Sequence, residues 1–304
     1  MSDARPIGIF DSGLGGLTVA RAVARQLPGE RIVYLGDTAR VPYGTKSAAT
    51  VSRYARECAA FLRGRDIKAL VVACNTASSL AMEELGRFLD PLRIPLLGVI
   101  EPGAVEACRV TRHGRIGVIG TPATIRSGAY ERAIARIRPD VSVAAAACPL
   151  FVPLVEEGWT DAADPAARAI ARRYLAPLVR QRIDTLILGC THYPLLSGVI
   201  AAAVEEASRA VAEGTGGAPQ SDVALVDASV SVARDLARLL AREGMAGPAS
   251  EEAGRDGGPR HAYFVTDDPE RFRDVGVRFL GHAIEGPASI DLSAARPIET
   301  GVEP

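Results

Sequence analysis

Short apolar runs alternate with amphipathic segments along most of the chain, and this pattern narrows the choice of fold more than any other feature. In the first hundred residues the expected strands are residues 7–10, 31–35 and 69–73, and the expected helices are residues 17–27 and 48–62. Strands that alternate with helices of this length are typical of a mostly parallel sheet with helices on both faces. We therefore expect the fold class to be α/β.

The same pattern returns in the second half of the chain, where residues 115–119, 141–145 and 185–188 are the expected strands. The first and third strands of the two halves correspond in order, and each third strand leads into a cysteine, Cys74 or Cys190. The sequence predicts two similar, pseudo-symmetric parallel-sheet α/β domains with the active site between them. A chance recurrence of the α/β pattern stays open as the alternative.

Charge and hydropathy exclude several classes of partner. The net charge is −1, from 35 basic and 36 acidic side chains. No basic excess is present to neutralise a run of phosphates, so we expect no nucleic-acid partner. No apolar stretch approaches the roughly 20 residues that cross a bilayer, and the first residues do not form a signal peptide. We expect no membrane association and a cytoplasmic location.

Two of the five cysteines are expected to be reactive. The odd number and the lack of a C-x-x-C pair argue against a disulfide framework and against a metal site. Cys74 and Cys190 each follow an apolar strand and precede a predicted helix, where ligands bind and where a helix N-terminus lowers the pKa of a thiol. Cys58, Cys108 and Cys148 are expected to be inert. The alternative for Cys74 and Cys190 is that both are small buried hydrophobes.

Two activated thiols on opposite sides of a cleft suit the racemisation of an amino acid. One base removes the α-proton from one face of the carbon and the other group protonates the opposite face. Asp11 and Ser12 follow the first strand, so we expect them beside Cys74, with a helix cap as the alternative role. His192 is the expected partner of Cys190. A cysteine hydrolase and a non-catalytic binding protein stay open as alternative functions.

The chain lacks the sequence patterns that hold two common cofactors. Gly13, Gly15 and Gly16 do not have the spacing of a dinucleotide loop, and we expect them to let the backbone approach a small ligand. Pyridoxal phosphate needs a Schiff-base lysine, and only Lys46 and Lys68 are present. Lys68 is expected to be a solvated charge, and no phosphate cradle accompanies Lys46. We expect a mechanism without a cofactor.

Five motifs resemble those of the glutamate racemases in the aspartate/glutamate racemase superfamily. They are GIFDSGLGG (residues 8–16), GDTARVPYG (36–44), ACNTAS (73–78), GTPAT (120–124) and LGCTHYPLL (188–196). The resemblance implies racemisation of L- and D-glutamate by a two-base cysteine mechanism without cofactor or metal. It also implies the supply of D-glutamate for peptidoglycan. Racemisation of aspartate by the same chemistry is the nearest alternative.

The resemblance also assigns roles to single residues. Cys74 would serve D-glutamate, Cys190 would serve L-glutamate, and Asp11 and His192 would assist the thiols. Glu156 matches the family's site glutamate better than Glu157. The residues expected to bind the substrate are Asp11, Ser12, Tyr43, Gly44, Asn75, Thr76, Thr121, Thr124, Glu156, Thr191 and His192.

The last third of the chain is less regular. Residues 213–221 and 247–260 are rich in glycine, proline and polar side chains, and we expect exposed loops there. The resemblance places the end of the chain with the first domain. The expected division is therefore a discontinuous first domain, residues 1–99 plus 209–304, around a second domain, residues 100–208. We expect the chain to form a homodimer.

Overall fold

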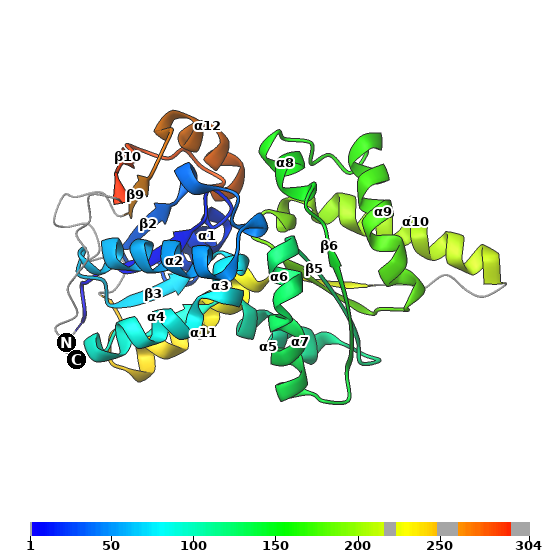
Figure 1. Cartoon of the computed structure of the whole chain (residues 1–304), viewed down its shortest axis with the longest axis horizontal. Coiled ribbons are helices and arrows are strands. Elements are labelled where there is room, and N and C mark those ends of the chain that lie inside the picture. Colours follow the sequence, from blue (N-terminus) through cyan, green and yellow to red (C-terminus); the bar gives the residue numbers. More distant parts are fainter. Residues whose placement is uncertain (1, 216–222, 248–260, 293–304) are drawn as a thin grey trace.

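The computed structural model describes residues 2–215, 223–247 and 261–292, and it contains two sheets that lie side by side in an elongated molecule (Figure 1). The six-stranded sheet has the order β10-β9-β2-β1-β3-β4 and the four-stranded sheet has the order β6-β5-β7-β8. Every pairing between strands is parallel. We call the elements around these sheets the first and the second domain, and the expected fold class is confirmed.

The strands of the first domain are β1 (Ile7–Asp11), β2 (Ile32–Gly36), β3 (Ala69–Val72), β4 (Leu96–Gly98), β9 (His261–Val265) and β10 (Ala288–Ser289). Those of the second are β5 (Arg115–Gly120), β6 (Ser142–Ala147), β7 (Thr185–Gly189) and β8 (Ala224–Val226). In both sheets the first strand is flanked by the next two, and the fourth pairs with the third. This shared order agrees with the predicted pseudo-symmetry. The central strands are buried along their length, as expected for a sheet covered on both faces.

The helices cover both sheets. In the first half of the chain they are α1 (Leu17–Gln26), α2 (Ala48–Arg63), α3 (Asn75–Leu80), α4 (Met82–Leu89), α5 (Ile100–Val110), α6 (Pro122–Ser127) and α7 (Ala129–Ile137). They continue with α8 (Phe151–Glu156), α9 (Pro165–Arg180), α10 (Ser197–Thr215), α11 (Ala228–Arg242) and α12 (Pro269–Leu280). Helix α3 begins directly after Cys74, whose side chain caps its first turn, and α4 follows after an interruption at Ala81.

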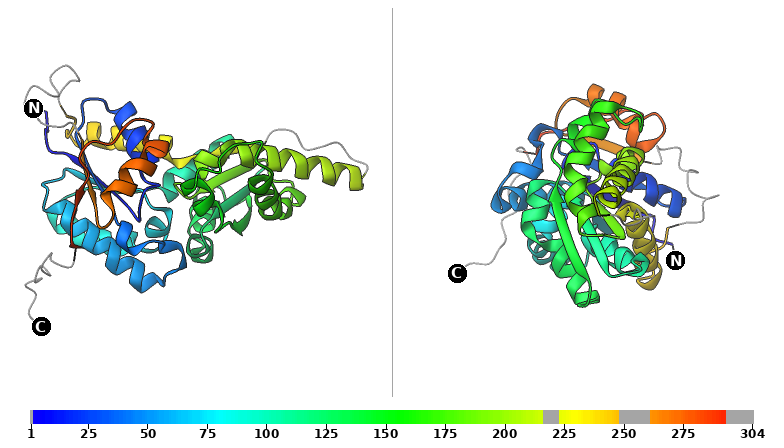
Figure 2. Two further views of the ribbon diagram at one scale, coloured as in Figure 1. Left: turned by 90° about the horizontal axis from the view of Figure 1, so that it is seen from above. Right: turned by 90° about the vertical axis from the view of Figure 1, so that its right-hand side faces the viewer.

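Helix α10 packs on α9 and continues to Thr215, into the stretch predicted to be a loop (Figure 2). The rest of that stretch, 216–222, and most of the second predicted loop, 248–260, lie outside the described residues. Strand β8 pairs with β7 at the edge of the second sheet. Helix α11 then packs on both α1 and α5. The division into a discontinuous and an inserted domain remains a proposal.

Lys68 corrects one expectation, because it is buried rather than solvated. Its ammonium group lies 2.5 Å from the carboxylate of Glu30 and donates to the backbone carbonyls of Asp3 and Met245. A sequence pattern places Lys68 before a strand but cannot show that three distant segments enclose it. The Lys68 ammonium group therefore links these segments at the amino-terminal edge of the first sheet.

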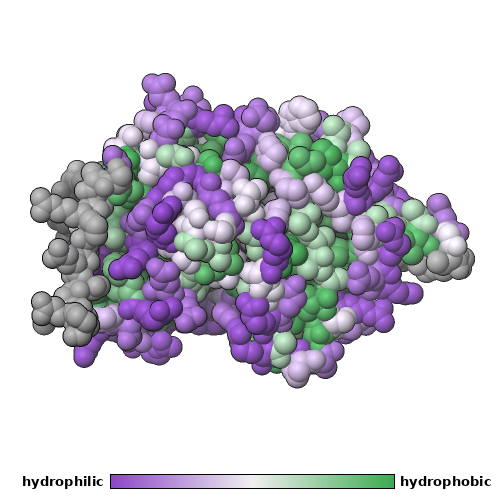
Figure 3. Space-filling model, in the orientation of Figure 1, coloured by the Kyte–Doolittle hydropathy of each residue, from purple (hydrophilic) through white to green (hydrophobic). Residues whose placement is uncertain are grey.

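The face of the molecule drawn in Figure 3 carries mostly hydrophilic residues, with apolar residues in scattered patches. Within the described ranges, no helix has the length and apolar character needed to cross a membrane.

Candidate active site

A cleft of about 280 Å³ is lined by residues from both domains. The predicted residues that line it are Ser12, Tyr43, Gly44, Cys74, Asn75, Thr76, Thr121, Glu156, Cys190, Thr191 and His192. The other two predicted residues, Asp11 and Thr124, are buried just behind this lining. Both cysteines stand at the carboxyl ends of strands, Cys74 after β3 and Cys190 after β7. The sheet topology therefore brings the two thiols to one cleft from separate sheets.

The Cys74 side of the cleft is built from the ends of β1 and β3. The Cys74 thiol donates to the hydroxyl of Ser12 at 3.4 Å, and its sulfur accepts from the backbone N–H of Ala77 at 3.5 Å. Asp11 is 1% exposed, and its Oδ2 accepts from the backbone N–H of Gly13 at 3.0 Å. Its Oδ1 is buried without a hydrogen-bond partner among the described residues. Burial raises the pKa of Asp11, although His192 and the backbone N–H groups oppose this.

The pKa of Cys74 corrects the expectation of an activated thiol. Burial, together with the charge of Asp11, raises this pKa to about 12, and the hydrogen bonds with Ser12 and Ala77 only partly offset the rise. The start of α3 stabilises a thiolate, but removing the charged sulfur from water costs more.

The Cys190 side contains a chain of three polar groups. The Cys190 sulfur lies 3.9 Å from Nδ1 of His192, and Nε2 of the same ring lies 3.1 Å from Oε1 of Glu156. Burial alone lowers the pKa of His192, but its hydrogen bonds with Cys190 and Glu156 outweigh burial and raise it to about 10. The hydrogen bond from His192 in turn holds the pKa of Glu156 below its usual range. His192 therefore carries a proton at neutral pH.

Hydroxyl and amide groups join the two domains across the floor of the cleft. The hydroxyl of Thr76 lies 2.9 Å from that of Thr121 and 3.2 Å from that of Thr124. Asn75 donates its side-chain N–H to the hydroxyl of Tyr130 at 2.8 Å. Thr121 also caps α6 by accepting from the backbone N–H of Thr124. These neutral groups offer donors and acceptors without adding a charge to the cleft.

The loop that carries Tyr43 and Gly44 is held in place by a hydrogen bond to Asp37 and by close packing against Thr121. The Tyr43 hydroxyl donates to the buried carboxylate of Asp37, so this hydroxyl is already engaged by the protein. Asp37 also accepts from Arg40 and from the hydroxyl of Thr266. A Cβ atom at Gly44 would lie 2.6 Å from Cβ of Thr121, so this close approach of the two domains requires glycine.

A model of the Asp/Glu/hydantoin racemase family matches residues 7–216 of the 304-residue chain. The chain belongs to this family. The glutamate racemase of Geobacter metallireducens is 50% identical over 292 residues, covering 96% of this chain and 98% of the relative. That of Syntrophus aciditrophicus is 44% identical over 287 residues, covering 94% and 97%. The expected membership is confirmed.

Solved structures of this racemase family have the same fold. The glutamate racemase of Francisella tularensis in complex with D-glutamate has a TM-score of 0.81 at 35% identity, covering 95% of this chain and 98% of that one. The enzyme of Thermus thermophilus in complex with β-chloro-D-alanine has a TM-score of 0.79 at 44% identity, covering 96% and 99%.

Sequence reasoning missed several residues that line the cleft of this racemase-family chain. They are Val41, Pro42, Thr45, Pro122, Pro149, Val152 and Pro153. Most of them are sequence neighbours of predicted site residues, and this proximity was the signal that could have found them. Lys46 is not part of the lining, and no group of three or more metal-binding side chains occurs in the portion of the chain that is described.

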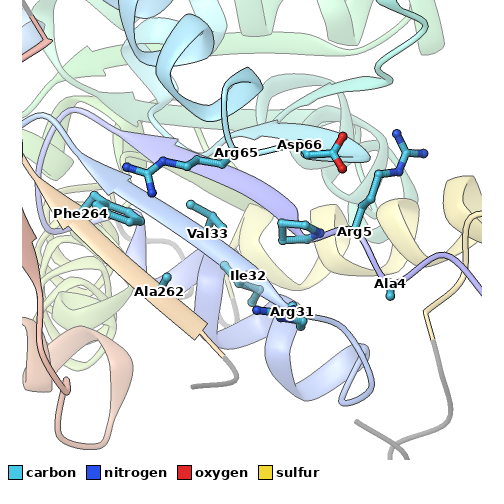
Figure 4. A pocket seen from close by; sticks show the side chains of 10 residues that line it. Ala4, Arg5, Arg31, Ile32, Val33, Arg65, Asp66, Ala262 and Phe264 are labelled. Atoms are coloured by element: carbon cyan, nitrogen blue, oxygen red, sulfur yellow. The ribbon is translucent and has the colours of Figure 1, made fainter. Parts of the chain in front are cut away.

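A second hollow, of about 460 Å³, lies at the opposite, amino-terminal edge of the first sheet (Figure 4). Arg5, Arg31 and Arg65 border it, and the guanidinium of Arg65 lies 4.3 Å from the centre of the Phe264 ring. Its described lining contains no cysteine or histidine. The larger hollow is therefore not the candidate site for proton transfer at carbon.

Proposed function

We propose that this chain interconverts L-glutamate and D-glutamate, with Cys74 and Cys190 as its two acid-base groups and with no cofactor. The observation that carries the proposal is the single cleft that both thiols line, each from the end of a strand in a different sheet. Family membership supports the reaction class, and the glutamate racemase relatives support the substrate.

In the proposed reaction the two sulfurs exchange one proton each with the substrate. With D-glutamate, the Cys74 thiolate takes the α-proton while the Cys190 thiol gives a proton to the opposite face of the carbon. With L-glutamate the roles are reversed. After each turnover, the sulfur that took the α-proton is a thiol and the sulfur that gave a proton is a thiolate. A further proton exchange restores the starting state.

Neighbouring groups would prepare each thiol. Asp11 is buried, and its Oδ1 finds no hydrogen-bond partner in the described part of the chain. Its raised pKa makes it a better proton acceptor for Cys74 than an exposed aspartate. The ammonium group of a bound amino acid would bring a positive charge close to Cys74 and oppose the effect of burial. On the other side, the protonated ring of His192 lies 3.9 Å from the Cys190 sulfur.

Neutral groups would hold the substrate between the thiols. We assign its amino and carboxylate groups to the side chains of Ser12, Asn75, Thr76, Thr121, Thr124 and Thr191 and to the backbone at Tyr43 and Gly44. Tyr43 would act through its backbone because its hydroxyl is engaged by Asp37. Asp11, Glu156 and His192 would contribute charge around these contacts.

The biological setting follows from the substrate. We propose that the chain supplies D-glutamate for peptidoglycan in the cytoplasm and acts as a homodimer. The balanced charge and the lack of a membrane-crossing helix in the described residues are consistent with this setting. Light scattering during size-exclusion chromatography would measure the oligomeric state.

The reaction is tested by proton NMR of purified protein with L-glutamate in deuterated water. The α-proton signal should disappear as D-glutamate forms, and Cys74→Ala and Cys190→Ala should each lower kcat by at least about 1,000-fold. Cys108→Ala is the matched control, since that thiol lies outside the cleft in α5 and its loss should leave kcat unchanged. Racemisation that survives either cleft substitution would contradict the two-base assignment, and turnover of aspartate alone would contradict the substrate.

A further inference from the structure

Helix α12 of the first domain contacts α8 of the second at the edge of the cleft (Figure 1). Glu156, the last residue of α8, uses both carboxylate oxygens: Oε1 lies 3.1 Å from Nε2 of His192, and Oε2 accepts from Arg271 at 3.3 Å. The backbone carbonyl of Glu156 accepts from Arg278 at 2.5 Å. One residue of the second domain is thus held by two arginines of α12.

The two arginines lie on one side of α12 because residues seven positions apart are two turns apart on a helix. The helix itself is anchored: Asp268 caps its first turn, and Phe272 and Phe279 are buried. The Phe279 ring also packs edge-on against His192, with ring centres 5.1 Å apart. Helix α12 therefore contacts both members of the His192–Glu156 pair.

Gly158 provides independent evidence that the sequence accommodates the contact between Arg278 and Glu156. Its φ of +82° is a conformation that other residues rarely adopt. A Cβ atom at Gly158 would lie 3.2 Å from the guanidinium carbon of Arg278, so a side chain there would crowd the arginine. The turn after α8 is therefore shaped to let Arg278 reach the Glu156 carbonyl.

We propose that Arg271 and Arg278 are positioning residues that hold α8 against the first domain, so that Glu156 keeps its hydrogen bond with His192. This inference rests on the proposed function for its effect on turnover. The groups that face His192 are Cys190 on its own segment, Asp11 from the β1 side and Glu156 from α8, whereas α12 presents the Phe279 ring to it directly. The two arginines act on His192 only through Glu156.

The expected consequence is a change in the titration of His192. Without the arginines Glu156 is free to turn toward solvent, and His192 loses an acceptor that favours its protonated form. The pKa of His192 should then fall from its raised value by at least about 0.5 unit. The Arg271 guanidinium is half-exposed, so part of the same effect should appear in unaltered protein at high ionic strength.

The test compares Arg271→Met/Arg278→Met with Arg273→Met, an exposed arginine of the same helix that pairs with Asp274 instead. Histidine NMR spectra report the pKa of His192, identified by the signal lost in His192→Asn. Trp159, the chain's one tryptophan, directly follows Gly158 and is 51% exposed, so its fluorescence reports the end of α8. The double variant should shift both signals and lower kcat about three- to tenfold, and Arg273→Met should change none of them.

Two outcomes would overturn the inference. One is an unchanged His192 titration in the double variant. The other concerns the same double substitution made in a Glu156→Gln background. There the arginines should have no further effect, because the carboxylate is gone, so a change in the His192 pKa as large as that seen with Glu156 present would contradict the inference. Both spectroscopic signals are measured without turnover, so a failure of the proposed racemisation is distinguishable from a failure of this contact.

Discussion

At the scale of single residues, the two sides of the cleft are prepared differently. Cys74 is surrounded by a hydroxyl, a backbone N–H and a buried carboxylate, whereas Cys190 has a protonated imidazole beside it. Burial and Asp11 both disfavour a negative charge on Cys74. The resting form of this residue is therefore the thiol.

This difference predicts how alkylation of Cys74 depends on pH. Since its pKa is raised to about 12, the thiolate fraction should grow about tenfold per pH unit from pH 7 to pH 10. The rate of modification by iodoacetamide, followed by mass spectrometry in a Cys190→Ala background, should rise in the same proportion. A rate that levels off below pH 9 would show that Cys74 ionises more easily than its burial allows.

At the scale of elements, the loops at the two edges of the first sheet have different roles, one in forming the cleft and the other in stabilising the fold. The loops at its carboxyl edge supply the cleft, and the segments at its amino edge are joined by the buried pair of Lys68 and Glu30. Both side chains are almost wholly removed from water, and Glu30 also accepts from the backbone N–H of Gly247. Loss of one partner would leave the other charge buried alone.

We therefore predict that Lys68→Met lowers the free energy of unfolding by about 3–5 kcal/mol. Removal of both charges in Lys68→Met/Glu30→Met should cost less, because neither variant side chain then leaves an isolated charge. Urea unfolding measures both values, and the pair is far enough from the cleft that kcat of the folded variants should hold. A larger loss in the double variant than in the single one would argue against an ion pair as the stabilising contact.

At the scale of the whole molecule, the cleft depends on how closely the two domains approach. Gly15 and Gly44 mark two close points of this approach. A Cβ atom at Gly15 would lie 2.2 Å from the Thr191 hydroxyl and 2.5 Å from Nδ1 of His192. Gly15 was expected to make room for a ligand. Instead, it makes room for the opposite domain, which a sequence cannot show.

Gly15→Ala should therefore displace the segment that carries His192. We expect a loss of about 1–3 kcal/mol in the free energy of unfolding from overpacking, and a fall in kcat of at least tenfold. The control is Gly86→Ala within α4, where a Cβ atom meets nothing within 4 Å and the better helix former should add about 0.5–1 kcal/mol. Urea unfolding and the NMR assay measure both quantities. Equal activity of the two variants would mean that the domains separate easily at Gly15.

The sequence by itself determined the α/β class, the repeated order of strands and the family. These follow from local patterns: an apolar strand needs neighbours on both faces, and a cysteine directly after a parallel strand must lie at the carboxyl edge of the sheet. The five motifs identified the family because each one is a contiguous run of residues that can be read from the sequence. The roles of single residues in the reaction remain predictions that the proposed experiments address.

Only the tertiary structure decided which distant residues meet. It paired His192 with Glu156, buried Lys68 beside Glu30, engaged the Tyr43 hydroxyl with Asp37, and kept β8 in the second sheet. It also reversed the expected direction of the Cys74 pKa, because the cost of burial exceeds the help from a helix N-terminus. Burial and contacts between domains depend on segments far apart along the chain, and no local pattern records how closely those segments approach.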